Sequence, residues 1–121
     1  MTYSEVVVRV PNAVVLIGDP LGNPPESMNG RLVAETSSCV AVGTLSEADG
    51  ATTIRVGSVV DAVDTALELV FDGTIEASSG RLAVSSVSGE NYIERRVAAG
   101  EVRLRILVND PREPDQIRVV V

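Results

Sequence analysis

Four acidic residues in two separate segments are the side chains whose positions first suggest a binding site. Glu47 and Asp49 lie in the loop-like segment 45–50, and Asp61 and Asp64 follow the apolar run at 52–58. If both segments lie at one end of a folded domain, their carboxylates could approach one another. Oxygen ligands would suit Ca²⁺, but the spacing matches no known calcium-binding loop. We therefore treat Glu47, Asp49, Asp61 and Asp64 as candidate partner-binding residues and expect no metal and no cofactor.

The basic residues exclude much catalytic chemistry, because all ten are arginine and the chain has no histidine and no lysine. Ser-His and Cys-His dyads, histidine-ligated metals, Schiff-base lysines and P-loop lysines are therefore absent. We expect a protein that is not an enzyme.

One short motif points to catalysis nonetheless. Asp64-Thr65-Ala66 follows Ala62-Val63 and is similar to the Asp-Thr-Gly-Ala segment of the dimeric, single-domain aspartic proteases. In such a dimer two aspartates would share a proton, because like charges at close range cannot both ionise. Here Ala66 replaces the glycine, and no later apolar-apolar-Gly-Arg segment is present. A solvated turn in which Asp64 has an Asx or capping role is favoured over a protease.

Arg103 and Arg105 share one face of a predicted strand, and Arg118 lies across the hairpin from them. Three arginines in one patch could hold a carboxylate or a phosphate. Cross-strand salt bridges are the favoured interpretation, with partners among Glu94, Glu101 and Glu113.

The net charge of −7 argues against nucleic acid as a partner, because an acidic surface repels phosphates. It favours solubility and a basic protein partner. Cys39 is the only cysteine, so it forms no internal disulfide, and its strand-like surroundings predict a buried, unreactive thiol. No apolar run is long enough to span a membrane. We expect a soluble, cytoplasmic protein, with a piece of a larger protein as the alternative.

Valine-rich runs with alternating polar residues predict strands throughout the chain, because branched side chains suit a pleated sheet. The predicted strands are 4–10, 13–18, 31–43 (one long strand or two short ones broken near 36–38), 52–58, 66–76, 81–87, 92–97 and the two arms of a hairpin at 101–121. Residues 18–30 are rich in glycine and proline and form the longest predicted loop.

Residues 59–71 are ambiguous, because their apolar positions fit helical spacing in one half and strand spacing in the other. We predict a single helical turn or loop at 59–64, followed by a strand that bends near Asp72-Gly73. A helix over 59–70 is the alternative.

The clearest hairpin is 101–121, whose two apolar arms flank the turn Asp110-Pro111-Arg112-Glu113. Val119, Val120 and Val121 make the second arm apolar on both faces. We expect this strand to lie inside a sheet or against a partner subunit. An exposed apolar edge strand would pair with another chain, so a self-assembling β module is one functional alternative.

Turn signals at intervals of about eight to twelve residues indicate an all-β fold. The sequence predicts one domain over residues 1–121, an antiparallel β-sandwich of the jelly-roll type. We expect about eight or nine strands and at most one short helical turn near 59–64.

Residues 66–121 also show a layout met in a known family. Phe71-Asp72-Gly73 is followed by Gly80-Arg81-Leu82-Ala83-Val84, by 99–105 and by Pro114-Asp115-Gln116-Ile117. This layout resembles the small acidic β-sandwich family of the competence-nuclease inhibitor. The resemblance implies a protein that blocks a basic nuclease or toxin through an acidic surface, and it identifies no individual inhibitory residue.

Three functions follow from the sequence in order of preference. The first is a non-catalytic protein-binding module, an inhibitor or immunity-like partner of a basic protein such as a nuclease. The second is a self-assembling structural β module, which would be a homo-oligomer. The third is a dimeric aspartic protease.

Overall fold

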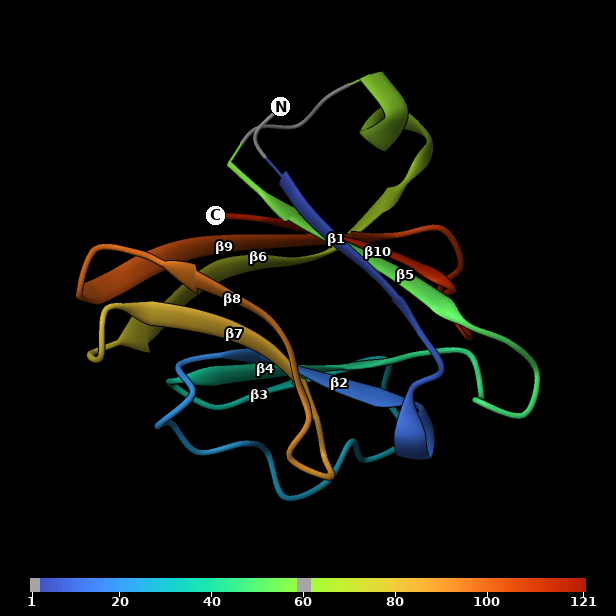
Figure 1. Ribbon diagram of the computed structural model, residues 1–121, viewed down its shortest axis with the longest axis horizontal. Helices are drawn as coiled ribbons and strands as arrows, with labels where there is room; N and C mark the ends of the chain where they lie inside the picture. The colour runs from blue at the N-terminus through green and yellow to red at the C-terminus, as the bar shows by residue number, and fades with distance from the viewer. Residues whose placement is uncertain (1–2, 59–61) are drawn as a thin grey trace.

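Two five-stranded β-sheets pack face to face in the computed structural model, which describes residues 3–58 and 62–121 (Figure 1). Sheet A has the strand order β1 (Tyr3–Val8), β5 (Thr52–Gly57), β10 (Gln116–Val120), β9 (Gly100–Val108) and β6 (Glu68–Ala77). Sheet B has the order β3 (Val33–Glu35), β4 (Cys39–Gly43), β2 (Val14–Gly18), β7 (Arg81–Ser86) and β8 (Asn91–Arg96). Two short 3₁₀ turns complete the described elements, η1 (Pro11–Ala13) and η2 (Ala62–Ala66). The sequence predicted at most one such turn, near 59–64, so η1 corrects that prediction.

The predicted all-β sandwich is confirmed, with two corrections. The described residues form ten strands, because the run at 31–43 is two strands separated by the turn Thr36-Ser37-Ser38. The sandwich is not wholly antiparallel, because β5 and β10 run parallel to each other. None of the described helical segments has the length and apolar character needed to cross a membrane.

The core is aliphatic and lies between the sheets. Alternate residues of each strand point inward, as the period-two pattern requires. Phe71 is the aromatic side chain of the buried cluster, and valine, isoleucine and leucine fill the rest. The largest fully buried side chains are Ile17, Ile54, Ile75, Leu82, Leu104, Ile106 and Ile117.

β10 occupies the centre of sheet A, between β5 and β9. Its residues Ile117, Val119 and Val120 are buried, which confirms the prediction that this strand lies inside a sheet. The hypothesis of self-assembly through an exposed edge at 117–121 is therefore wrong, since both sides of β10 are already hydrogen-bonded to neighbouring strands.

Two connections must cross the outer faces of the sandwich. β2 ends beside Cys39, whereas β3 begins beside Val42, so residues 19–32 return along the outside of sheet B. In the same way β5 ends beside Tyr3, whereas β6 begins beside Val108, and η2, in the described part of the β5–β6 connection, lies on the outside of sheet A. Figure 1 shows η2 above sheet A and the 19–32 connection below sheet B.

η2 ends after five residues and the strand β6 begins at Glu68. The alternative of a helix over 59–70 is therefore wrong for the described part of that segment, and residues 59–61 lie outside it. The pairing of β6 with β9 shifts register between Leu69 and Phe71, whereas it is regular at Asp72-Gly73, where a bend was predicted.

A buried ion pair joins η2 to sheet A. Arg118 points outward from the middle of β10 and donates from Nε to Asp64 Oδ2 at 3.0 Å, and its Nη1 donates to the carbonyl of Val119 at 2.9 Å. Arg118 is 2% exposed and Asp64 is 1% exposed. The Tyr3 ring covers the pair, with its centroid 6.0 Å from the guanidinium carbon of Arg118. Each charge therefore depends on the other, because an unpaired buried charge is costly.

Asp64→Asn should destabilise the fold by about 3–5 kcal/mol, because it removes the negative charge of Asp64 from the buried pair with Arg118. Urea unfolding followed by circular dichroism measures the change. The matched control is Asp72→Asn, which breaks the exposed ion pair with Arg103 and should cost less than about 1 kcal/mol. Equal losses in the two variants would contradict the role assigned to Asp64.

Candidate partner-binding surface

Four loops meet at one end of the sandwich, which we call the acidic end: residues 9–13, 44–51, 87–90 and 109–115. The strand registers bring these loops together. In sheet A, Val8 pairs with Thr52, and Gln116 pairs with Thr53. In sheet B, Ser86 pairs with Val15. Backbone hydrogen bonds tie the loops to one another. The Leu45 amide donates to the Pro114 carbonyl at 2.9 Å, and the Thr44 amide donates to the Ala13 carbonyl at 2.8 Å.

The acidic end carries a large share of the protein's charge. Its four loops hold six acidic residues and two arginines, so they contribute −4 to the net charge of −7. The acidic residues are Glu47, Asp49, Glu90, Asp110, Glu113 and Asp115. At the opposite end, the turns 36–38, 78–80 and 97–99 contain no charged residue. The negative potential of the protein is therefore strongest at one end.

Side-chain hydrogen bonds hold the 109–115 turn in a fixed shape. Asp110 Oδ1 accepts from the amides of Arg112 at 2.8 Å and Glu113 at 3.2 Å. These bonds lower the pKa of the Asp110 carboxyl. Asn109 Oδ1 accepts from the amides of Asp115 and Gln116, which closes the base of the turn. A partner would therefore meet preorganised carboxylates, which reduces the entropic cost of binding.

The 44–51 loop is held on both sides. Ser46 accepts from the Asp49 amide through its carbonyl and from the Ala48 amide through its hydroxyl. Arg9 donates from Nη1 to the backbone carbonyl of Glu47. The Glu47 side chain is exposed, as is that of Asp49.

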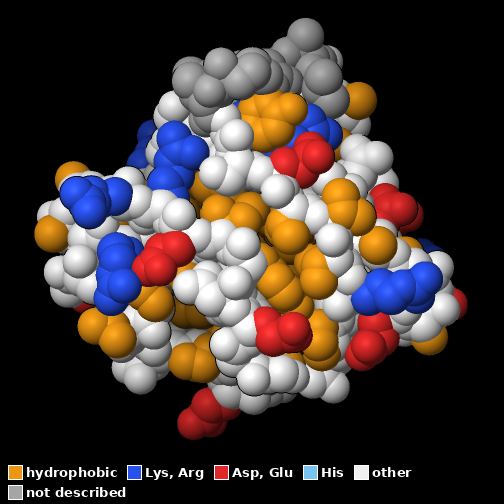
Figure 2. All heavy atoms as spheres, in the orientation of Figure 1, with side chains coloured by type: hydrophobic (Ala, Val, Ile, Leu, Met, Phe, Trp, Pro, Cys, Tyr) orange, Lys and Arg blue, Asp and Glu red, His pale blue; other side chains and the backbone are white. Residues whose placement is uncertain are grey.

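Tyr92 is a half-buried aromatic residue beside the acidic end. Its hydroxyl donates to Glu90 Oε1 at 3.5 Å. Burial raises the pKa of this hydroxyl, and the nearby carboxylates of Glu90 and Glu47 raise it further. Figure 2 shows apolar side chains in the middle of the face where the edge strands β1 and β8 lie, with charged side chains around them. Tyrosine at the border of an apolar and a charged region is typical of protein interfaces.

The structure separates the four residues that the sequence grouped. Glu47 and Asp49 lie together at the acidic end, Asp61 lies outside the described residues, and Asp64 is buried against Arg118 on the outer face of sheet A. Sequence reasoning missed Glu90, Asp110, Glu113 and Asp115. Their positions in predicted turns were visible, but their convergence with Glu47 depends on strand pairing.

Asp64 does not have the environment of a protease aspartate. Its carboxylate faces an arginine and is buried, whereas a catalytic dyad needs two carboxylates that share a proton and reach substrate. The aspartic protease alternative is therefore wrong. Among residues 3–58 and 62–121, no group of three or more acidic or cysteine side chains is placed to hold a metal ion.

Two of the three arginines in the predicted patch form separate ion pairs, whereas Arg105 lines a hollow of about 410 Å³ together with Arg103. Arg103 and Arg118 do lie on the same outer face of sheet A, but each has an aspartate partner, Asp72 at 2.9 Å and Asp64 at 3.0 Å. The favoured salt-bridge interpretation is correct in kind, although the glutamates named as partners are not the ones used. Glu94 pairs instead with Arg81 at 2.9 Å.

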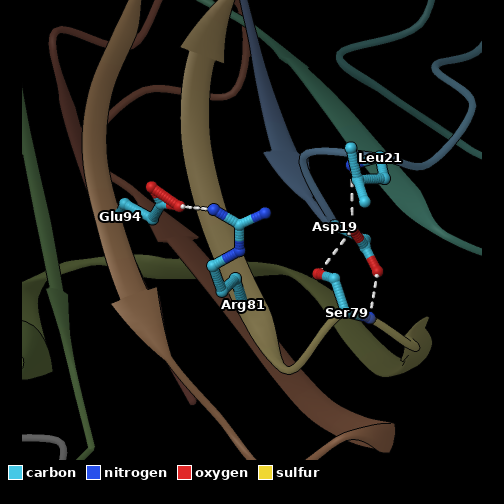
Figure 3. A network of polar contacts seen from close by, with 5 residues as sticks. All are labelled: Asp19, Leu21, Ser79, Arg81 and Glu94. Atoms are coloured by element: carbon cyan, nitrogen blue, oxygen red, sulfur yellow. Dashed lines mark hydrogen bonds and ion pairs between the residues drawn. The ribbon is translucent and has the colours of Figure 1, made fainter.

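A polar network centred on Asp19 fixes the end of the sandwich opposite to the acidic end (Figure 3). Asp19 accepts hydrogen bonds from the Ser79 amide at 3.0 Å, the Ser79 hydroxyl at 2.8 Å and the Leu21 amide at 2.8 Å. Gly18 lets the chain pass close to β4, since a Cβ there would lie 2.3 Å from the Ser38 carbonyl oxygen. The network thus anchors the start of the 19–32 connection to the β6–β7 turn.

Comparisons with known proteins show a shared fold with solved structures, but they find no relative by sequence. No family model and no curated protein matches the sequence. ComJ of Bacillus subtilis, an inhibitor of the DNA-degrading activity of NucA, matches with a TM-score of 0.70 at 8% identity, over 99% of this chain and 95% of that one. A protein described as crocagin biosynthetic gene J matches with a TM-score of 0.53 at 14% identity, over 98% of this chain and 95% of that one. The likeness of fold extends over nearly the full length of each protein.

The Asp19 network predicts a pH effect on stability. Burial alone would raise the pKa of this carboxyl, but hydrogen bonds from Ser79 and Leu21 hold it below its ordinary value of 3.8. A carboxyl group whose pKa is lowered on folding stabilises the folded state at pH values above its ordinary pKa. This stabilisation is lost as the pH falls through the folded-state pKa. Wild type should therefore exceed Asp19→Asn in unfolding free energy at neutral pH, and the gap should narrow below about pH 4.

Urea unfolding of both proteins between neutral pH and strongly acidic pH measures this gap. Ser79→Ala is the control, and it should keep part of the pH dependence, because the two backbone amides still reach Asp19. A gap that is the same at every pH would contradict the role of the network.

Cys39 should be unreactive in the native protein. Its side chain is buried, and burial raises the pKa of the thiol to about 11. Because the thiolate is the reactive form, a disulfide reagent at pH near 8 should modify native protein far more slowly than protein unfolded in guanidinium. The exposed Ser78→Cys variant is the positive control, and equal rates for both native thiols would overturn the prediction.

Proposed function

We propose that this protein is a non-catalytic protein-binding module that inhibits a basic protein, such as a nuclease, by docking the acidic end against it. The observation that carries the proposal is the convergence of six acidic residues from separate loops at one end of the sandwich. Opposite charges on two proteins speed their encounter and disfavour wrong partners.

The state of these carboxylates supports the proposal. Four ion pairs are found among the described residues, and none involves a carboxylate of the acidic end. Glu47, Asp49 and Glu113 are exposed and so are available to a partner's arginines and lysines. The carboxylates of Glu90, Asp110 and Asp115 also accept hydrogen bonds within the protein. The shared fold with ComJ, which is an inhibitor of a nuclease, is a second line of support. We include a cytoplasmic location in the proposal, because the chain's one cysteine is buried as a free thiol.

The proposal can be tested with two triple variants that change the net charge equally. The acidic-end triple is Glu47→Gln, Asp49→Asn and Glu113→Gln. The control triple is Asp72→Asn, Glu76→Gln and Glu101→Gln, whose side chains are exposed elsewhere. Each triple changes the net charge from −7 to −4. Carboxylates that shape the 109–115 turn are left intact, so the loops should keep their structure.

Wild type immobilised at low salt should recover a basic protein from lysate of its source, and the same protein should be recovered by the control triple. With that protein purified, the acidic-end triple should associate at least about tenfold more slowly, and the difference should shrink as salt is added. If the protein is a nuclease, wild type should inhibit its cleavage of DNA.

Two results would count against the proposal. If wild type enriches no basic protein at low salt, the proposed function as an inhibitor of a basic protein is wrong. If both triples lose binding to the same extent, net charge alone governs association and the acidic end is not the binding site.

A further inference from the structure

An apolar hollow lies on the outer face of sheet B, beside the acidic end. It measures about 340 Å³. Val14, Leu16 and Ala41 form its floor on β2 and β4, and residues 24–28 of the crossing connection form its wall. Val87, in the β7–β8 turn, stands at its mouth and is 45% exposed.

The hollow follows from the way the chain crosses the sheet. Leu16 and Ala41 are neighbours on the outer face and would be exposed without a cover. The crossing connection supplies that cover, but Pro24 and Pro25 fix its backbone dihedrals and lack amide donors, so it does not pair with the sheet. Met28, which is half-buried, lines the remaining space. Unbranched methionine adapts readily to different occupants.

The mouth of the hollow is negative. Glu26 lines it, and Glu90 lies in the same tight turn as Val87, which is closed by a hydrogen bond from the Ser86 amide to the Glu90 carbonyl. Glu90 is itself part of the acidic end. Arg31 lies with Glu26 and Glu35 along an adjoining hollow, where the two glutamates outnumber it. The apolar surface is therefore continuous with the acidic surface.

We propose that this hollow receives an apolar side chain of the basic partner, one that is flanked by arginine or lysine. The inference rests on the proposed function and adds the chemistry of the contact. The side chain fills the space above Leu16 and Ala41, and a flanking cation meets Glu26. Buried apolar anchors with a charged rim carry most of the affinity in many interfaces. Acidic partners are excluded by the same rim.

The test uses small probes and so does not depend on finding the partner. Phenylbutylguanidinium carries an apolar group and a cation, and phenylbutyrate carries the same group and an anion. Methyl-labelled protein is titrated with each and followed by ¹H–¹³C spectra. The cationic probe should shift the methyl signals of Val14, Leu16, Met28 and Val87 in a saturable way, with a millimolar dissociation constant, and the anionic probe should bind about tenfold more weakly.

Three variants give the test its specificity. Val87→Ser removes the apolar mouth and Glu26→Gln removes a rim charge, and each should weaken binding of the cationic probe several-fold. Leu21→Ser is the control, because Leu21 is 76% exposed on the same connection but does not line this hollow. Distant methyl signals report whether each variant is folded.

The outcomes separate the hollow from the proposed function. Equal binding of the two probes, or no shift of the hollow's methyl signals, overturns this inference even if a basic partner is found. The same signals could instead shift when the protein concentration is raised without a probe. That result would assign the hollow to a second copy of the chain and would also overturn this inference. Probe binding without any basic partner would instead contradict the proposed function alone.

Discussion

The structure depends on the insertion of β10 into the middle of sheet A. β1 and β5 come from the first half of the chain, and β6 and β9 come from the second half. β10 joins these two pairs, because it bonds in parallel to β5 and antiparallel to β9. Its inward residues Ile117 and Val119 lie in the core, while its outward Arg118 holds η2 through Asp64. A single strand thus completes the sheet, fills the core and fixes one of the two crossing connections.

The two crossing connections meet the same geometric demand in different ways. Each must return along the outside of a sheet, because the next strand begins at the end opposite to where the last one finished. On sheet A a buried ion pair holds the crossing segment against the strands. On sheet B the network around Asp19 anchors the segment at one end, and proline-rich chain leaves a hollow further along. The space left beside this connection is the hollow that we propose as a docking site.

Local sequence patterns predicted most strands but not the long-range contacts. Alternating apolar residues located nearly every strand, and the apolar character of 117–121 on both faces correctly placed β10 inside a sheet. The parallel pairing of β5 with β10 and the ion pair between Asp64 and Arg118, which are 54 residues apart, have no local signature. For the same reason Asp64 was grouped with Glu47. An aspartate in a buried ion pair and one in an exposed loop have similar sequence surroundings, and only the fold distinguishes them.

Carboxylates that stabilise the fold have partners within the protein. Those that we assign to binding make no ion pair among the described residues. Asp64, Asp72 and Glu94 each face an arginine, and Asp19 is satisfied by hydrogen bonds. The carboxylates of the acidic end make no ion pair among the described residues, so their mutual repulsion weakens the folded state at low salt. A fold stabilised by aliphatic packing and a few internal pairs can tolerate that repulsion. A basic partner would relieve it, and this relief would add to the attraction between the two surfaces.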